Sequence, residues 1–150
     1  MAEMQPKPDI ARLAERRLEV VVGNPHAIHG QTRVRVDGDG ALRAELWKAP
    51  PGKDRAARRP EQQLAAEGRL APSQTEQVFR MAEQLNWNRK FPDRPGVPDE
   101  SIVEFQLTAG GEKSSARFWV HDAEQDPRCG PVLELLRAEM RRASNGKIYL

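Results

Sequence analysis

The sequence predicts an α+β domain: an antiparallel sheet built from two hairpins and extra short strands, with two helices packed on one face. Two stretches, at 31–47 and 102–120, alternate apolar with polar residues and turn back at glycines, which is the pattern of a β-hairpin. Two other stretches, at 73–87 and 131–143, repeat apolar residues at spacings of three and four, as amphipathic helices do. Because adjacent hairpins favour antiparallel pairing, we expect both helices on the same sheet face.

The composition fits one domain and excludes several classes of protein. The chain has 150 residues, of which 38% are hydrophobic and 31% are charged, with a net charge of +2. A membrane protein, a disulfide scaffold and a strongly basic nucleic-acid-binding tail would each need a different composition. We expect residues 1–17 to form a loose tail or a short helix, and residues 18–150 to form a single α+β domain.

The first half of the predicted domain is a strand followed by a hairpin. Residues 18–22 include three consecutive valines and end at a Gly-Asn-Pro breaker at 23–25. The Asp-Gly-Asp-Gly sequence at 37–40 divides the stretch 31–47 into two arms and supplies residues that accept a positive φ. This pattern predicts a tight turn between two strands with one wet face.

The middle of the chain is predicted to form a loop, a short element and a helix. Residues 48–60 contain three prolines, a glycine and five cations, so we expect an exposed loop. Residues 62–70 fit a short strand or a helix. The helix at 73–87 opens with a capping box, in which Ser73 and Glu76 bond each other's backbone amides. A second exposed loop is expected at 88–100, which contains three prolines and a glycine.

The last third is predicted to form the second hairpin and the second helix. Strands are expected at 102–107 and 116–120, joined by a glycine-containing connection at 109–114. The helix at 131–143 begins with a proline and is followed by Asn-Gly, which suit a helix start and a helix end. The final residues, 147–150, pair as a short edge strand or fray.

These features together resemble a known kind of domain. The Asp-Gly-Asp-Gly turn is followed by Glu-Gly-Arg-Leu-Ala-Pro-Ser at 67–73, which leads into a helix ending in Leu-Asn-Trp at 85–87. A late hairpin and an amphipathic helix complete the layout. Over residues 18–144 it is similar to small bacterial α+β domains of unknown function built from two hairpins and two helices. The resemblance implies the fold alone, because those families carry no assigned catalytic residues.

Three histidines and a carboxylate are the candidate metal ligands. His26 and His29 lie three residues apart in a stretch flanked by proline and glycine, and His121 precedes Asp122 at the end of the last predicted strand. Two histidines and a carboxylate can bind zinc with a water molecule in the fourth position. The same spacing is also typical of surface histidines in loops, so both interpretations stay open.

Cys129 is the single cysteine, directly before the last predicted helix. A helix N-terminus favours a thiolate, and His121 lies a short distance upstream, so a Cys–His nucleophile is a second enzymatic hypothesis. The alternative is a small, half-buried residue at a helix cap. Because the sequence has no P-loop, no dinucleotide-binding glycine motif and no nucleophile elbow, we expect no catalytic residue and no cofactor.

Two tryptophans and four arginines are the candidate partner-binding residues. The alternation directs Trp47 and Trp119 to the sheet face opposite the core, and exposed tryptophans beside arginines are typical of interface anchors. The alternatives are that a helix or the 88–100 loop covers the two rings, and that the basic run is simply solvated. The candidate residues are Trp47, Trp119 and Arg117 on the strands, and Arg55, Arg58 and Arg59 in the basic loop.

The leading functional hypothesis is a non-enzymatic protein-interaction or accessory domain of a bacterial cytoplasmic system. Two alternatives stay open: a small metal-dependent or Cys/His hydrolase, and a nucleic-acid accessory protein that uses the basic 48–59 loop to contact phosphates. No membrane partner is expected, because no stretch has the length of a membrane helix. The cytoplasm is expected from the lone cysteine and from the lack of a signal-peptide core, and heavy use of arginine, alanine and proline indicates a GC-rich bacterial genome.

Overall fold

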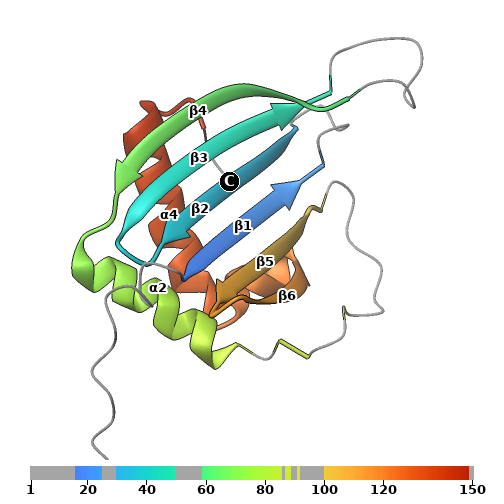
Figure 1. The fold of residues 1–150 in the computed structure, drawn as a ribbon. Helices are drawn as coiled ribbons and strands as arrows, with labels where there is room; N and C mark the ends of the chain where they lie inside the picture. Colours follow the sequence, from blue (N-terminus) through green and yellow to red (C-terminus); the bar gives the residue numbers. More distant parts are fainter. Residues whose placement is uncertain are drawn as a thin grey trace, which may run out of the picture.

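A six-stranded antiparallel sheet and three helices make up the α+β fold of the residues that the structure describes. The computed structural model describes residues 16–24, 30–49, 59–85, 87–88, 91 and 100–148. The strand order is β4-β3-β2-β1-β5-β6, so β1 lies inside the sheet and joins the two hairpins (Figure 1). The strands are β1 (Arg17–Gly23), β2 (Gln31–Asp37), β3 (Ala41–Lys48), β4 (Glu61–Arg69), β5 (Ile102–Ala109) and β6 (Glu112–Trp119). The helices are α2 (Pro72–Gln84), α3 (Val120–Gln125) and α4 (Cys129–Ser144).

Both predicted hairpins are present, and their turns depend on glycine. Gly40 has a φ of 94°, and a Cβ at this position would lie 2.9 Å from the carbonyl oxygen of Leu70. Only glycine therefore fits where the β2–β3 turn meets the start of α2. Gly110 and Gly111 have φ values of 60° and 80° and close the β5–β6 hairpin. This turn is shorter than the predicted connection at 109–114, so the two strands are longer than expected.

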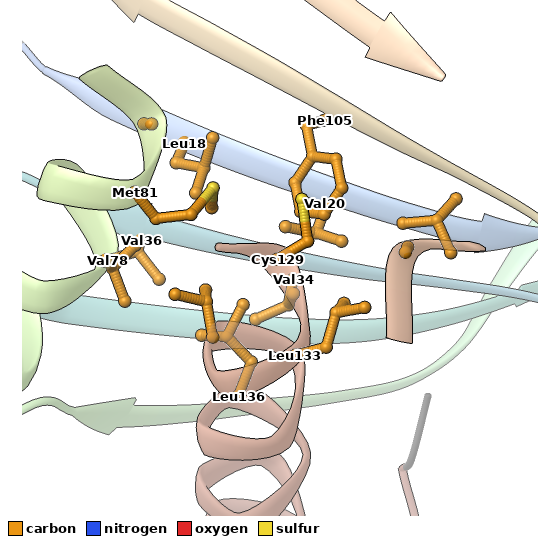
Figure 2. Close-up of a cluster of buried hydrophobic side chains, with 14 of the residues drawn as sticks. Leu18, Val20, Val34, Val36, Val78, Met81, Phe105, Cys129, Leu133 and Leu136 are labelled. Carbon is orange, nitrogen blue, oxygen red and sulfur yellow. The ribbon is translucent and has the colours of Figure 1, made fainter. Parts of the chain in front are cut away.

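The core lies between the sheet and the helices. Figure 2 shows apolar side chains of β1 and β2, such as Leu18 and Val36, directed toward Met81 of α2 and toward Leu133 and Leu136 of α4. All of these side chains are buried. Alternation along β1 and β2 therefore directs every second side chain of these strands toward the core, as the sequence predicted.

The helix α4 lies close to the edge strand β4 because of one glycine. A Cβ on Gly68 would lie 3.3 Å from the Cβ of Ala143 on α4. The sequence left 62–70 open between strand and helix, and the structure shows a strand of nine residues. Small residues on the helix side of this strand allow the close approach of α4.

Within the described residues, the structure adds one short helix to the two that the sequence predicts. The additional helix α3 begins directly after β6, so Val120 is a helical residue and not the last strand residue. The backbone N–H of Val120 donates to the carbonyl oxygen of Ser101 at 2.9 Å, which attaches the start of α3 to the start of β5. A helix of six residues is too short to show apolar periodicity in the sequence.

The predicted helix ends also need correction. Helix α2 begins at Pro72 and not at a Ser73 cap, because proline suits the first helical position. The backbone N–H of Ala71 donates to Oε1 of Gln74 at 2.8 Å, so Gln74 takes the role predicted for Glu76. Helix α4 begins at Cys129, two residues earlier than predicted.

Some predictions fall outside the described residues. Residues 1–15, the last two residues and most of the predicted loops at 48–60 and 88–100 belong to this group. Ile148, predicted to lie in an edge strand or to fray, is instead buried beside α4, where its N–H donates to Ser144 Oγ at 2.9 Å. Within the described ranges, no helix combines the length and apolar character needed to cross a membrane.

Candidate functional site

The candidate site is the sheet face that no helix of the described residues covers, called the open face below. Because the buried residues of each strand point toward the helices, their neighbours in sequence point to the open face. Figure 1 looks onto this face, with α4 behind the strands. The polar and aromatic side chains on it include Arg17, Glu19, Gln31, Arg33, Arg35, Arg43, Glu45, Trp47, Glu67, Glu104, Arg117 and Trp119.

Trp47 lies in a hydrogen-bonded cluster on β2 and β3. Its indole Nε1 donates to Oε1 of Glu45 at 3.0 Å. The guanidinium of Arg33 lies over the indole ring, 4.5 Å from its centroid, and Arg33 Nε donates to Oε1 of Gln31 at 2.7 Å. The strand register places Gln31 opposite Trp47 and Arg33 opposite Glu45. These contacts fix a half-buried aromatic ring in one orientation on the open face.

Glu45 stabilises this cluster by accepting hydrogen bonds from both Trp47 and Arg43. Its second oxygen accepts from Arg43 Nε at 2.7 Å, while Arg43 Nη1 donates to Glu67 at 3.0 Å. Burial alone would raise the pKa of Glu45, but the hydrogen bonds from Arg43 and Trp47 outweigh it and lower that pKa below its usual value of 4.5. The hydrogen bond from Arg43 to Glu45 in turn raises the pKa of the guanidinium. Glu45 is therefore a carboxylate at neutral pH.

A shallow depression lies in the middle of the open face. Its polar lining consists of Glu19 on β1, Arg33 and Arg35 on β2, and Arg43 and Glu45 on β3. Arg35 lies opposite Arg43 in one register and opposite Glu19 in the other. The depression therefore brings three arginines and two carboxylates together from three neighbouring strands.

Trp119 is covered by an aromatic ring from a distant part of the chain. The ring of Phe91 lies 5.1 Å from that of Trp119, centroid to centroid, at an angle of 53°. The guanidinium of Arg117 lies 5.2 Å from the Phe91 centroid and 4.0 Å from Glu104. Among the alternatives that the sequence left open, this contact favours cover by a residue of the 88–100 segment.

The two predicted tryptophans do not form one patch. Trp47 is on β3 and Trp119 on β6, and the strands β2, β1 and β5 lie between them. The strand registers align both residues with the same end of the sheet, next to Gln31 and Ile102 respectively. Trp47, which has its own arginine and carboxylate neighbours, is therefore a candidate contact separate from Trp119.

The predicted metal ligands are not brought together within the described ranges. His26 and His29 lie outside those ranges. Nδ1 of His121 lies 3.2 Å from Oε2 of Glu100, whose side chain is fully buried, and the His121 backbone N–H donates to the same oxygen at 3.3 Å. Asp122 lies in the first turn of α3. No group of three or more potential metal-ligating side chains occurs in the part of the chain that the structure describes.

Glu100 is a residue that the sequence interpretation missed. It caps the N-terminus of α3 from a position more than twenty residues earlier in the chain. An acidic residue at the end of a proline-rich stretch gives no signal of such a role.

Cys129 is part of the core. Its side chain is completely buried, and Figure 2 shows the sulfur among side chains that include Val20 and Phe105. Its backbone N–H donates to Oδ1 of Asp126 at 3.1 Å. A buried thiol packs as a small apolar side chain. This position gives the predicted Cys–His nucleophile no access to a substrate.

Most of the predicted basic loop lies outside the described residues. Arg55 and Arg58 belong to that part, whereas Arg59 is exposed two residues before β4. Lys48 ends β3 at the other side of this segment. The partner contacts predicted for the loop remain predictions.

Comparison with known proteins gives no family: no family model matches the chain, and no curated protein is significantly similar to it. The functional argument therefore depends on the geometry of the open face.

Proposed function

We propose that this chain is a non-enzymatic domain that binds another protein across the open face of its sheet. The observation that carries the proposal is the Trp47 cluster, a fixed aromatic ring with Arg33 stacked on it and Glu45 bonded to it, on a sheet face that no described helix covers. Tryptophan and arginine are enriched among the residues that dominate protein interfaces. A rigid aromatic side chain also loses little conformational entropy when a partner covers it.

The setting of this proposal is the bacterial cytoplasm. It is supported by the single cysteine, which is buried as a free thiol, and by the composition of the chain. The sheet geometry does not depend on the compartment. A protein partner also agrees with the mixed charge of the open face, where arginines and carboxylates alternate along and across the strands.

The test is capture of the partner from the native organism, followed by affinity measurement with the purified, identified protein. Trp47→Ala should weaken binding at least tenfold, since interface tryptophans commonly contribute this much. Ala65→Arg is a second variant, because Ala65 is exposed on β4 opposite Glu45 and a long side chain there obstructs the face. Arg80→Gln on the exposed side of α2 is the control and should bind as the wild type does.

Circular dichroism and thermal unfolding must show that each variant is folded. A partner that binds Ala65→Arg and Trp47→Ala as tightly as the wild type would contradict the proposal. So would a partner whose binding is lost in Arg80→Gln, because it would then contact the helix layer. These two outcomes separate the open face from the opposite side of the domain.

A further inference from the structure

We infer that the open face recognises an acidic segment of its protein partner, whose carboxylates bind Arg33 and Arg35. This inference rests on the proposed function and names the chemistry of the partner at the same site. Its basis is the unequal way in which the three arginines of the central depression use their hydrogen-bond donors.

Arg43 is already neutralised within the domain. It donates to Glu45 at 2.7 Å and to Glu67 at 3.0 Å, so two carboxylates share its charge. Glu45 in turn accepts from Trp47. An incoming carboxylate would have to displace one of these partners, so Arg43 is not the expected contact.

Arg33 has donors to spare and is held in place. Its Nε bonds Gln31 and its flat side lies on Trp47, while its terminal nitrogens make no hydrogen bond to another described residue. A guanidinium fixed in this way has lost much of its side-chain freedom before a ligand binds. It can offer its two terminal nitrogens to a carboxylate in the bidentate geometry that arginine favours.

Arg35 is the least satisfied of the three. Its Nε is screened from solvent and has no hydrogen-bond partner among the described residues. Its nearest carboxylate is that of Asp37, at 3.8 Å, and the same Asp37 oxygen accepts from Arg17 at 2.8 Å. On the neighbouring strands Arg35 lies opposite Glu19 and opposite Arg43, whose charge Glu45 and Glu67 already share. A carboxylate bound beside Arg35 would supply the close charged acceptor that this side chain lacks among the described residues.

A protein segment fits this face better than a nucleic acid. Glu19, Glu45 and Glu104 lie among the arginines and would repel a continuous phosphate backbone. Base stacking needs accessible aromatic faces, whereas Arg33 covers one side of Trp47 and Phe91 lies on Trp119. Separate carboxylates on a peptide can reach Arg33 and Arg35 without lying on the glutamates.

The test uses a fluorescein-labelled Ser-Glu-Ser-Glu-Ser peptide, whose two separated carboxylates match the spacing of Arg33 and Arg35, with Ser-Gln-Ser-Gln-Ser as the uncharged control, in fluorescence polarisation. Wild-type protein should bind the acidic peptide at low salt and lose affinity as salt is added. Arg33→Gln and Arg35→Gln should each weaken binding about tenfold, the size expected for one exposed charge-assisted hydrogen-bonded contact. Arg80→Gln removes the same charge from α2 and should leave the affinity unchanged.

Glu19→Gln is expected to gain affinity, and a gain in affinity cannot result from loss of folding. Glu19 lines the same depression and lies opposite Arg35, so loss of its charge should strengthen binding of the acidic peptide severalfold. Equal weakening by Arg80→Gln, no binding at low salt, or no gain in Glu19→Gln would each overturn the inference. So would tighter binding of a single-stranded oligonucleotide of matched charge through Arg33 and Arg35.

The same variants separate this inference from the proposed function. If Trp47→Ala abolishes binding of the captured partner but Arg33→Gln and Arg35→Gln do not, the open face is an interface and the inference of an acidic segment is wrong. If none of the three substitutions releases the partner, both are wrong.

Discussion

Glu45 and Glu67 allow the effect of burial on the open-face cluster to be measured directly. Both carboxylates accept from Arg43, at 2.7 Å and 3.0 Å, but the Glu45 side chain is 21% exposed and that of Glu67 is 75% exposed. Replacement of Glu45 by glutamine removes the charge and leaves one oxygen to accept from both Arg43 and Trp47. We expect Glu45→Gln to lower the free energy of unfolding by about 1–2 kcal/mol.

The matched control is Glu67→Gln, which changes the same group opposite the same arginine. Because exposed ion pairs contribute about 0–1 kcal/mol, we expect a loss of less than about 0.5 kcal/mol for this variant. The assay is urea unfolding followed by tryptophan fluorescence and circular dichroism. Equal losses for the two variants, or a larger loss for Glu67→Gln, would refute the reasoning that burial and the second donor make Glu45 the stronger contact.

The pH dependence of the same difference has a definite sign. The pKa of Glu45 in the folded protein is lowered from 4.5, so the unfolded chain binds the proton more tightly. The stabilisation by ionised Glu45 is therefore fully present above pH 4.5 and is lost as the pH falls through the folded-state pKa. The difference between wild type and Glu45→Gln should shrink in acid, and a difference that grows there would contradict the lowered pKa.

Three further predictions concern the helix layer. Gly130→Ala should lower the free energy of unfolding by about 1–3 kcal/mol, because a Cβ at this position would lie 2.5 Å from the carbonyl oxygen of Glu124. This clash outweighs the intrinsic helix preference of alanine over glycine, which is about 1 kcal/mol. Unchanged or raised stability would contradict this prediction. The Cys129 thiol should react with a thiol reagent such as Ellman's reagent only after unfolding, and rapid reaction of the native protein would disprove its burial. Glu100→Ala should destabilise the domain more than His121→Ala does, by about 1 kcal/mol in urea unfolding, because it also removes the acceptor for the α3 backbone N–H; the reverse order would assign the role of Glu100 to the imidazole contact alone.

The parts of the fold that depend on local patterns could be predicted from the sequence. The alternation of Val34 and Val36 with arginines predicts one buried face for β2, and the Asp-Gly-Asp-Gly turn predicts the return strand. Helix α3 has only six residues, and its start depends on Ser101 and Glu100 from another element. No pattern within the helix itself contains that information.

The assignment of β4 shows a second limit of local patterns. Its sequence reads Glu-Gln-Gln-Leu-Ala-Ala-Glu-Gly-Arg, which fits a strand or a helix equally well on composition. This segment forms a strand because it pairs with β3, and glycine is needed at position 68 because Ala143 of α4 packs closely against it. Both causes are tertiary contacts between residues far apart in the chain.

The candidate site was predicted only in part for the same reason. The sequence treated Trp47 and Trp119 as equivalent, because both occupy strand positions opposite the core. The difference between them comes from the strand order, which separates them by three strands, and from Phe91, which covers Trp119. Arg33 and Glu45 follow the same alternation, but which arginine pairs with which carboxylate depends on the register between strands.

The open face combines two properties that a binding surface needs and that usually oppose each other. Its side chains are charged enough to keep an uncovered sheet in water, and the Arg43–Glu45–Trp47 contacts hold them in fixed positions. Most of these donors and acceptors are satisfied within the domain, so a partner meets little unpaired charge. Arg33 and Arg35 differ, since their terminal nitrogens have no such bond within the described ranges. The specificity for an acidic partner that we propose therefore depends on these two arginines, on a face whose other charges are mostly paired within the domain.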